Sequence, residues 1–312
     1  MTEEQLNVIV SKMKKLSVQT CRNIPFSGLT TLGVGGTIKL AVYPDSKKRL
    51  LGVLKTLYRL KAEYVVLGKG SNVLASDNEY DGVVVVNRAS GVTVRGRKVT
   101  ALSGTPTVTL SKQLQSRGLS GGEFTACLPA TVGGAVVSNA GCYGQCVADV
   151  LTSVTVFYKG RVRVIRANKC GFSKRSSLFK RQKGYTVLSA DFRFTESCEQ
   201  AVKNRIAEMR EQKARTQPLN YRSAGCVLYH DKVAVSRLLD KCGLKGYTVG
   251  GAQVSAKHAG FVVNVDKATS GDIYLVIKRM TERLRQDYGI QPKLEVELVN
   301  FSKEEYDFFS RR

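Results

Sequence analysis

The chain has 312 residues, of which 43% are hydrophobic and 24% are charged, a balance typical of globular proteins. This excludes collagen-like, low-complexity and disordered chains, and the length predicts about two domains. The longest apolar runs, such as the four valines at 83–86, are far shorter than the roughly 20 residues of a membrane helix. The N-terminus has no apolar core followed by a small-residue cleavage site, so we expect no signal peptide and a cytoplasmic location.

The chain is strongly basic, with 49 Lys and Arg against 25 Asp and Glu and a formal charge of +24. Such an excess favours anionic partners, which include nucleic acid, a membrane surface and phosphorylated ligands. Basic residues are densest at 159–183 and 278–285, but no basic tail is present and the chain has no Trp. We therefore expect neither a nucleic-acid nor a membrane partner.

Eight cysteines occur without CxxC pairs, and the only histidines are His230 and His258. A zinc site is therefore not expected. Reduced thiols that fill small spaces in the core are the expected state of most of these cysteines.

The first part of the chain mixes short strands with a few helices, which is typical of an α+β fold. We expect helices at 5–16, 46–62 and 105–118, the last ending at Gly118. The expected strands are 37–44, 64–68, 82–87, 91–101, 151–167 and 185–195. A hairpin turn is predicted at Lys159-Gly160.

From about residue 196 the pattern becomes more helical. We expect helices at 198–215, at 231–242 closed by Gly243, and at 269–287 with Thr269 or Ser270 as N-cap. The expected strands are 224–229, 259–265 and 293–301. The change predicts two domains, 1–195 and 196–312.

Three segments concentrate glycine where strands give way to turns: residues 33–36, residues 67–72, and residues 129–134 leading to 139–141. Glycine permits positive φ and close approach to a ligand, and exposed amides in such turns bind phosphate. Each segment taken alone is as readily a tight turn. The three together, beside the basic surplus, favour a dinucleotide site. The Rossmann and Walker A patterns are both missing, so FAD on another fold fits best.

Seven motifs are spread over almost the whole chain. The most specific is GLSGGEFTACLPATVGGAVVSNAGCYG at 118–144. The others are TTLGVGG at 30–36, LGKGSNVL at 67–74, CGFSKRSSLF at 170–179, QPLNYRSAGCV at 217–227, GLKGYTVGGAQVSAKHAGFVVN at 243–264 and GIQPKLEV at 289–296. With these motifs, in this order, the chain resembles the UDP-N-acetylenolpyruvoylglucosamine reductase family. No extra segment carries the Tyr-bearing loop of some members, so the chain is similar to the shorter type.

The resemblance implies an FAD-binding region of the vanillyl-alcohol-oxidase type in two subdomains, followed by a substrate-binding domain. It implies non-covalent FAD and NADPH as co-substrate. NADPH reduces FAD, the flavin N5 delivers hydride to C3 of the enolpyruvyl group, and C2 is protonated. The product would be UDP-N-acetylmuramate, a peptidoglycan precursor.

Three catalytic residues follow from the motifs. Arg175 would stabilise the carboxylate and the developing enolate, and Glu295 would hydrogen-bond the carboxylate. The family's proton donor is commonly Ser, and here the position holds Cys226, whose thiol is a reasonable acid. Taken without the motif, Arg175 is a surface base, Glu295 a solvated strand residue and Cys226 a structural cysteine.

The resemblance also implies two sets of ligand contacts. The expected cofactor contacts are Gly35, Gly68, Lys69, Gly70, Ser71, Asn72, Pro129, Ala130, Thr131, Val132, Gly133, Gly134, Asn139, Gly141 and Arg215. The expected substrate contacts are Lys174, Tyr229, His230, Lys257, His258 and Asn264. For His258 a packing role is equally open, and the Lys69 side chain is as readily directed to solvent. No metal ligand is expected.

The chain departs from the family pattern mainly on the substrate side. The departures are Lys174, Arg222, Cys226, Tyr229, His230 and Glu297. Two alternatives to the reductase stay open: a flavin oxidase of the same superfamily acting on another small substrate, and a non-catalytic or nucleic-acid-binding protein on the same scaffold. The sequence does not indicate an oligomeric state.

Overall fold

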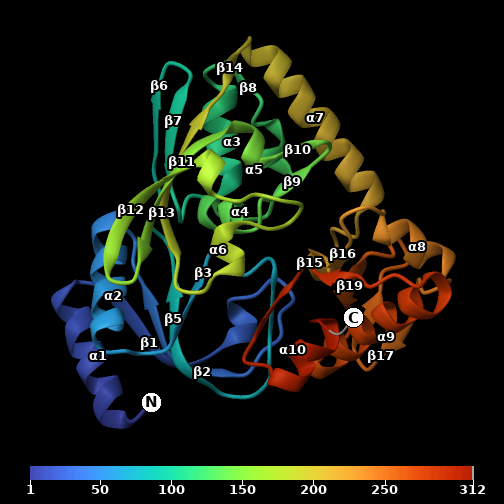
Figure 1. The fold of residues 1–312 in the computed structure, drawn as a ribbon, viewed down its shortest axis with the longest axis horizontal. Helices are drawn as coiled ribbons and strands as arrows, with labels where there is room; N and C mark the ends of the chain where they lie inside the picture. Colours follow the sequence, from blue (N-terminus) through green and yellow to red (C-terminus); the bar gives the residue numbers. More distant parts are fainter. Residues whose placement is uncertain (311–312) are drawn as a thin grey trace. The chain divides into compact units, whose positions relative to one another are not determined.

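The computed structural model describes residues 1–310 and has an α+β fold, as predicted (Figure 1). Its residues form two units. Unit 1 comprises Met1–Arg22, Leu40–Gly68 and Asp81–Lys213, and unit 2 comprises Asn23–Lys39, Lys69–Tyr80 and the chain from Ala214 onward. The expected single division at residue 195 differs from this arrangement, because two short early segments pair and pack with the C-terminal part of the chain.

Unit 1 contains a sheet with the strand order β1-β2-β5-β3. Only part of β1 and part of β2 belong to this unit. Its strands are β1 (Gln19–Pro25), β2 (Thr37–Tyr43), β3 (Tyr64–Leu67) and β5 (Tyr80–Val86). Helices α1 (Glu3–Lys15) and α2 (Lys47–Arg59) each bury an apolar stripe in the hydrophobic core that they form with this sheet. Leu50, Leu54 and Leu57 of α2 are fully buried there. The 3.6-residue spacing of these stripes is the pattern that predicted both helices.

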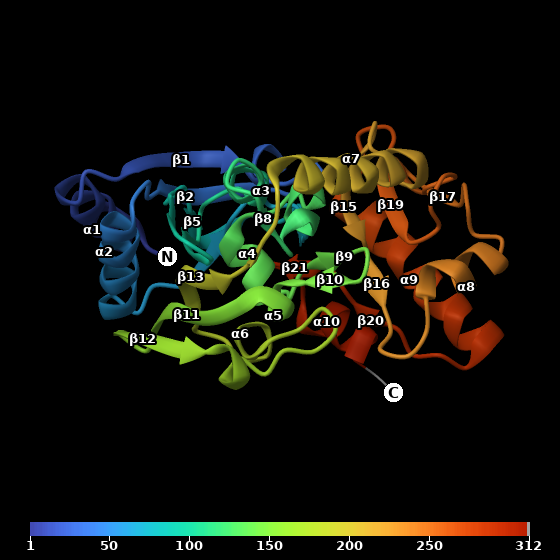
Figure 2. The ribbon, with the colours of Figure 1, turned by 90° about the horizontal axis from the view of Figure 1, so that it is seen from above.

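A second sheet of unit 1 is antiparallel in the order β12-β11-β13-β7-β6 (Figures 1 and 2). Its strands are β6 (Val92–Arg95), β7 (Lys98–Leu102), β11 (Leu151–Tyr158), β12 (Arg161–Arg166) and β13 (Thr186–Arg193). The predicted turn at Lys159-Gly160 is confirmed, with φ of 46° and 79° at the two residues. The predicted strand 91–101 is wrong as a single strand: Gly96, at φ 55°, turns it into the β6–β7 hairpin.

The glycine-rich stretch of unit 1 contains more regular structure than the sequence suggested. Helix α3 (Thr107–Gln115) ends before Gly118, at the C-cap Ser116, and α4 (Val132–Val137) forms despite its two glycines because Thr131 caps it. Short elements complete the unit: β8 (Leu119–Ser120), η2 (Glu123–Cys127), β9 (Gly141–Cys142), β10 (Gln145–Cys146), α5 (Val147–Val150), η3 (Ala167–Lys169), α6 (Leu178–Arg181) and β14 (Thr195–Glu196). Helix α7 (Glu199–Thr216) runs from unit 1 into unit 2.

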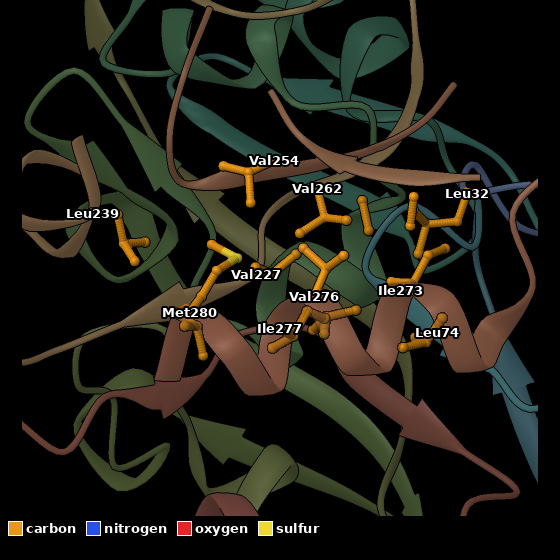
Figure 3. Packing of buried hydrophobic residues seen from close by; sticks show 14 of the residues in the cluster. Leu32, Leu74, Val227, Leu239, Val254, Val262, Ile273, Val276, Ile277 and Met280 are labelled. Atoms are coloured by element: carbon orange, nitrogen blue, oxygen red, sulfur yellow. The ribbon is translucent and has the colours of Figure 1, made fainter. Parts of the chain in front are cut away.

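Unit 2 is built on an antiparallel sheet in the order β15-β19-β18-β17. Its elements are η1 (Phe26–Gly28), β4 (Val73–Ala75), β15 (Arg222–Cys226), β16 (Leu228–Tyr229), α8 (Val235–Lys241), β17 (Thr248–Val249), β18 (Ala252–Val254), β19 (Phe261–Asn264), α9 (Ser270–Tyr288), β20 (Lys293–Leu294), β21 (Glu297–Val299) and α10 (Lys303–Ser310). The predicted cap of α9 is confirmed, since Thr269 and Asp272 form a capping box. Figure 3 shows Ile273, Val276 and Met280 of α9 packed in the core of this unit.

Residues from the two early segments complete the core of unit 2. Leu32 and Leu74 are fully buried in the same cluster as Ile273 (Figure 3). Strand β4 also pairs in parallel with β21, so that Leu74 lies beside Leu298. The N-terminal segments are therefore part of the fold of this unit.

Candidate active site

Two of the expected cofactor segments meet inside unit 1. A Cβ added to Gly68 would lie 2.3 Å from Thr131 Oγ1, so only glycine permits this close approach. Thr131 is the N-cap of α4, and its hydroxyl accepts a hydrogen bond from the amide of Gly134 at 3.4 Å. The turn after β3 is thus in contact with the start of α4.

The amides of residues 132–134 and those of residues 68–72 differ in their hydrogen-bond partners. The amides of Val132 and Gly133 donate to Thr105 O and Ser103 O, both at 2.8 Å, and the amide of Gly134 is taken by Thr131. By contrast, no acceptor within residues 1–310 takes the amides of residues 68–72. The predicted phosphate-binding role therefore fits residues 68–72, while residues 132–134 support their shape. An amide-lined turn of this kind fits the diphosphate of FAD.

In unit 2 the remainder of this turn lies against the early glycine-rich segment. The amide of Thr31 donates to Gly70 O at 3.1 Å, and Gly70, at φ 60°, approaches Leu29 O so closely that a Cβ would be 2.0 Å away. Gly35, at φ 117°, packs with the same tightness on Phe26 and Ala75. The glycines of both motifs are therefore required by backbone conformation and by close packing.

Arg175 lies at the tip of a tight turn in unit 1. Ser173 and Ser176 exchange backbone hydrogen bonds of 3.0 and 3.1 Å across the turn, and Arg175 has a left-handed φ of 55°. Asn139 holds the turn by donating to Ser173 O at 3.0 Å. A guanidinium nitrogen of Arg175 donates to Gly141 O at 2.8 Å. Such a backbone conformation at a charged residue is typical of functional sites.

The predicted residues Asn139, Gly141, Lys174 and Arg175 are thereby brought together. Lys174 occupies the same turn as Arg175. Asn139 is also fixed through its carbonyl oxygen, which accepts from the amide of Ala148 at 3.0 Å. Its role in this structure is to hold the turn that carries Arg175.

A pair of thiols lies beside this turn. A hydrogen bond from Cys142, and then the charges of Lys213 and Arg210, lower the pKa of Cys127 from 9.0 to about 7, against the effect of burial. The pKa of Cys142 is raised by its hydrogen bond to Cys127 and by burial. Lys213, on α7, donates to Cys127 O at 2.6 Å, and burial lowers its own pKa. Unit 1 therefore contains a thiol that ionises more readily than an ordinary cysteine.

In unit 2, Cys226 ends β15 directly after an irregularity of the strand pairing between Ser223 and Cys226, which contains Gly225 at φ 78°. A Cβ added to Gly260 would lie 3.3 Å from Cys226 Sγ and 3.1 Å from His258 Cε1. The thiol and the imidazole thus flank the same glycine. Burial lowers the pKa of His258, and its Nδ1 accepts from the amide of Gly260 at 3.2 Å. A neutral ring beside a thiol suits a site that handles a proton.

Glu295 is held beside Cys226 by the main chain. Its amide donates to the carbonyl of Val227, the residue after Cys226, at 2.8 Å. The side chain of Asn72 donates to Glu295 O at 3.0 Å. Unit 2 therefore brings together Asn72, Cys226, His258 and Glu295, four residues that the sequence placed in four separate motifs.

Other predicted contacts have structural partners. Lys257 donates to Ala214 O at 2.6 Å, at the end of α7. Asn264 donates to Leu32 O at 3.0 Å and accepts from the amide of Ala268. Tyr229 lies under Lys293, whose ammonium is 5.9 Å from the ring centre, and His230 Nδ1 accepts from the amide of Lys232. These bonds position the chain around the site, and ligand contact by these residues stays a prediction.

Tyr143 and Gln145 were missed by the sequence analysis. The Tyr143 hydroxyl and Gln145 Oε1 are buried polar atoms with no hydrogen-bond partner within residues 1–310. Both lie in the β9–β10 hairpin, next to Gly141, and Tyr143 has a positive φ of 54°. Buried polar atoms without a partner are uncommon, so we add Tyr143 and Gln145, close to Arg175's anchor Gly141, to the candidate ligand contacts. Tyr143 belongs to the signature motif at 118–144 and Gln145 is the next residue after it, but neither was among the predicted contacts.

Comparison with known proteins agrees with this geometry. Residues 38–167 match the FAD binding domain family, and residues 217–299 match the family described as UDP-N-acetylenolpyruvoylglucosamine reductase, C-terminal domain. The fold and the site therefore define an FAD-dependent oxidoreductase.

Individual relatives cover nearly the whole chain. The UDP-N-acetylenolpyruvoylglucosamine reductase of Moorella thermoacetica is 35% identical over 91% of this chain and 94% of its own length. That of Halalkalibacterium halodurans is 31% identical over 93% and 98%. The crystal structure of the reductase from Thermus caldophilus superposes with a TM-score of 0.77 at 30% identity, covering 90% of this chain and 98% of its own. The chain belongs to the UDP-N-acetylenolpyruvoylglucosamine reductase family.

Proposed function

We propose that this protein reduces the enolpyruvyl group of UDP-N-acetylenolpyruvoylglucosamine to give UDP-N-acetylmuramate, with NADPH as the reductant. Family membership over nine-tenths of the chain supports the reaction. The observation that carries the proposal is the grouping of Cys226, His258, Glu295 and Asn72 in unit 2. The chemistry of both substrates favours a cytoplasmic site of action, and within residues 1–310 no helix is long and apolar enough to cross a membrane.

FAD, when bound, supplies the redox chemistry by accepting a hydride from NADPH and passing it to the substrate. The amides of residues 68–72 would hold its diphosphate, and Thr131 and Gly68 would fix the shape of the adjoining turn. Positive charge at Lys69 adds to the attraction for phosphate.

The residues of this chain would then manage charge and protons on the substrate. Arg175, oriented by Gly141 O, would face the carboxylate, where negative charge develops as C3 is reduced. Cys226 Sγ would give its proton to C2, and the thiolate would recover a proton from water. Glu295 would orient the same carboxylate. The net change is the addition of one hydride and one proton across the carbon–carbon double bond, and NADPH leaves as NADP⁺.

Stopped-flow absorbance of the flavin band tests the two half-reactions separately. NADPH, added without oxygen to the FAD-loaded protein, should bleach the band, and the UDP-linked enolpyruvyl sugar should restore it. Bleaching without recovery would refute the proposed substrate. Fast recovery with oxygen instead of the sugar would favour the flavin oxidase alternative, which the comparisons do not favour.

A further inference from the structure

The positive charge of this chain is concentrated in two segments that contain no acidic residue. Residues 46–62 hold six Lys and Arg, and residues 150–190 hold ten. Together they account for much of the net charge of +24. The proposed reaction uses only Lys174 and Arg175 among these bases, so most of this charge has no role in catalysis.

The two segments meet in unit 1. Tyr58, in the last turn of α2, packs edge-on against Phe157 of β11 with ring centres 6.2 Å apart. The same ring lies over the β11–β12 turn, because a Cβ added to Gly160 would be 2.8 Å from it. Figures 1 and 2 both show β12 near α2, at the outer edge of the second sheet.

The register of β12 directs two valines to the side of the sheet that α2 covers. Val162 pairs with Phe157, and Val164 pairs with Thr155, so their side chains share the face of Phe157 and Tyr58. All three apolar side chains of this edge are exposed: Tyr58 by 48%, Val162 by 45% and Val164 by 67%. Exposed apolar side chains grouped at one edge mark an interaction surface.

Exposed bases surround these apolar side chains. Lys55, one turn before Tyr58, and Arg59, the residue after it, lie on the exposed side of α2. On β12, Arg166 lies on the same face of the strand as Val162 and Val164. We call Lys55, Tyr58, Arg59, Val162, Val164 and Arg166 the α2–β12 face.

The acids near this face have partners of their own. Asp45, before α2, pairs with Arg49 at 2.7 Å. Asp191, two strands in, accepts from Thr100 and Ser153, each at 2.7 Å. Glu63, exposed just beyond α2, is the remaining acid at this end of the helix. The three bases of the face outnumber this one acid, so the face keeps a net positive charge that can attract an external anion.

We propose that the α2–β12 face binds the surface of an anionic lipid bilayer. Tyrosine prefers the interface between headgroups and acyl chains, valine side chains enter it, and Lys and Arg pair with anionic headgroups. A nucleic-acid surface would instead offer polar side chains or stacking aromatics between the bases. The exposed valines favour lipid. The interaction is peripheral, so it is compatible with the lack of a membrane-crossing helix in residues 1–310.

Vesicle sedimentation of the FAD-loaded full chain tests the proposal. The protein should pellet with phosphatidylcholine vesicles that contain phosphatidylglycerol, not with phosphatidylcholine alone, and added salt should weaken binding. Arg59→Gln/Arg166→Gln should reduce binding about 30-fold, since each base near an anionic surface contributes about 1 kcal/mol. Val162→Thr/Val164→Thr, which keeps side-chain shape and β-propensity, should reduce it about tenfold or more.

Lys203→Gln/Lys303→Gln is the matched control, because it removes the same net charge from exposed positions outside the face and should leave vesicle binding unchanged. NADPH-dependent turnover should be the same in all of these variants. Absence of binding to phosphatidylglycerol vesicles would overturn the proposal. So would equal loss in the control pair, or full binding by the valine variant. Binding of duplex DNA that depends on Arg59 and Arg166 but not on the valines, without vesicle binding, would assign the face to nucleic acid instead.

Discussion

At position 226 the chain has a thiol, in the place that the family resemblance assigns to the proton donor. The Cys226 side chain follows the pairing irregularity that contains Gly225 and lies near Gly260, which His258 also approaches. A thiol releases its proton far more readily than an alcohol, and a neighbouring imidazole, kept neutral by burial, can exchange protons with it. We therefore expect Cys226 to supply the proton directly.

Replacement of Cys226 by Ala should slow turnover about 10²–10⁴-fold, the usual contribution of a general acid. Reduction of bound FAD by NADPH should keep its normal rate, because no substrate proton is involved in that half-reaction. Stopped-flow traces of the two half-reactions measure both quantities. Cys226→Ser should keep most activity, and Cys198→Ala, at an exposed thiol, is the control. Normal turnover of the Ala variant would remove Cys226 from the mechanism.

Cys127 offers a test of the charge around the thiol pair. Its folded-state pKa of about 7 lies below the ordinary 9.0, so the thiolate forms as pH rises through 7. The midpoint of alkylation by iodoacetamide, followed residue by residue with mass spectrometry, should lie near this value even though burial slows the reaction. Cys170, whose pKa burial raises to about 11, is an internal comparison and should react only at higher pH.

Two variants separate the causes of the low pKa of Cys127. Cys142→Ala removes the hydrogen bond and should move the midpoint upward the most, and Lys213→Gln removes the charge but keeps a donor for Cys127 O. A midpoint near 9 in the unmodified protein, or one that neither change affects, would contradict this assignment.

At the scale of elements, the turn that joins β3 to β4 is the part of the cofactor site most sensitive to a single methyl group. Gly68→Ala places a Cβ 2.3 Å from Thr131 Oγ1, so the cap of α4 must shift. We expect the purified variant to lose most of its FAD, measured as the ratio of visible flavin absorbance to protein. Gly28→Ala, where nothing lies within 4 Å of the new Cβ, should keep its flavin. Full flavin content in Gly68→Ala would mean that this contact does not shape the site.

Elements that short-range sequence signals determine, such as residue spacing and helix caps, were predicted well. Helix α9 was found from the spacing of Ile273, Val276 and Met280 and from its cap at Thr269. Helix α4 was missed because two glycines lower its propensity, and part of what stabilises it is distant: besides the local cap at Thr131, Ser103 O and Thr105 O accept its first amides. The β6–β7 hairpin was missed because 91–101 was treated as one extended run, although the valines change from even positions (92 and 94) to an odd one (99) across Gly96.

The candidate site shows the same contrast between features that lie in motifs and features that depend on distant partners. Motifs led to Arg175, Cys226 and Glu295, and unit 2 brings Cys226 and Glu295 together through Val227. Lys213 was not found, because a lysine in a charged helix has no local feature that shows it bonded to Cys127. The amides of Val132 and Gly133 differ from those of residues 68–72 because they have acceptors, Thr105 O and Ser103 O, and a sequence pattern does not show these distant partners.

At the scale of the whole molecule, the two units are assembled from separated segments of the chain. The predicted domain boundary at residue 195 followed the change from strand-rich to helix-rich patterns, because such patterns reflect local structure. It could not show that β4 pairs with β21, more than 200 residues later, or that Leu32 and Leu74 belong to the core around Ile273. Non-local pairing of this kind leaves no periodic signal in either partner.

The arrangement predicts that residues 196–312 do not fold alone. The fragment lacks Leu32, Val34 and Leu74, which are at least 97% buried in the core of unit 2, and it lacks the strand that pairs with β21. Burial of three such side chains contributes roughly 5–8 kcal/mol, which is comparable with the whole net stability of a domain. The fragment should show weak near-ultraviolet circular dichroism and a non-cooperative urea transition. A fusion that adds residues 23–39 and 69–80 through flexible linkers should restore a cooperative transition, and a fusion with Leu32 and Leu74 both changed to Ser should not. Cooperative unfolding of the bare fragment would show that the early segments are dispensable for this core.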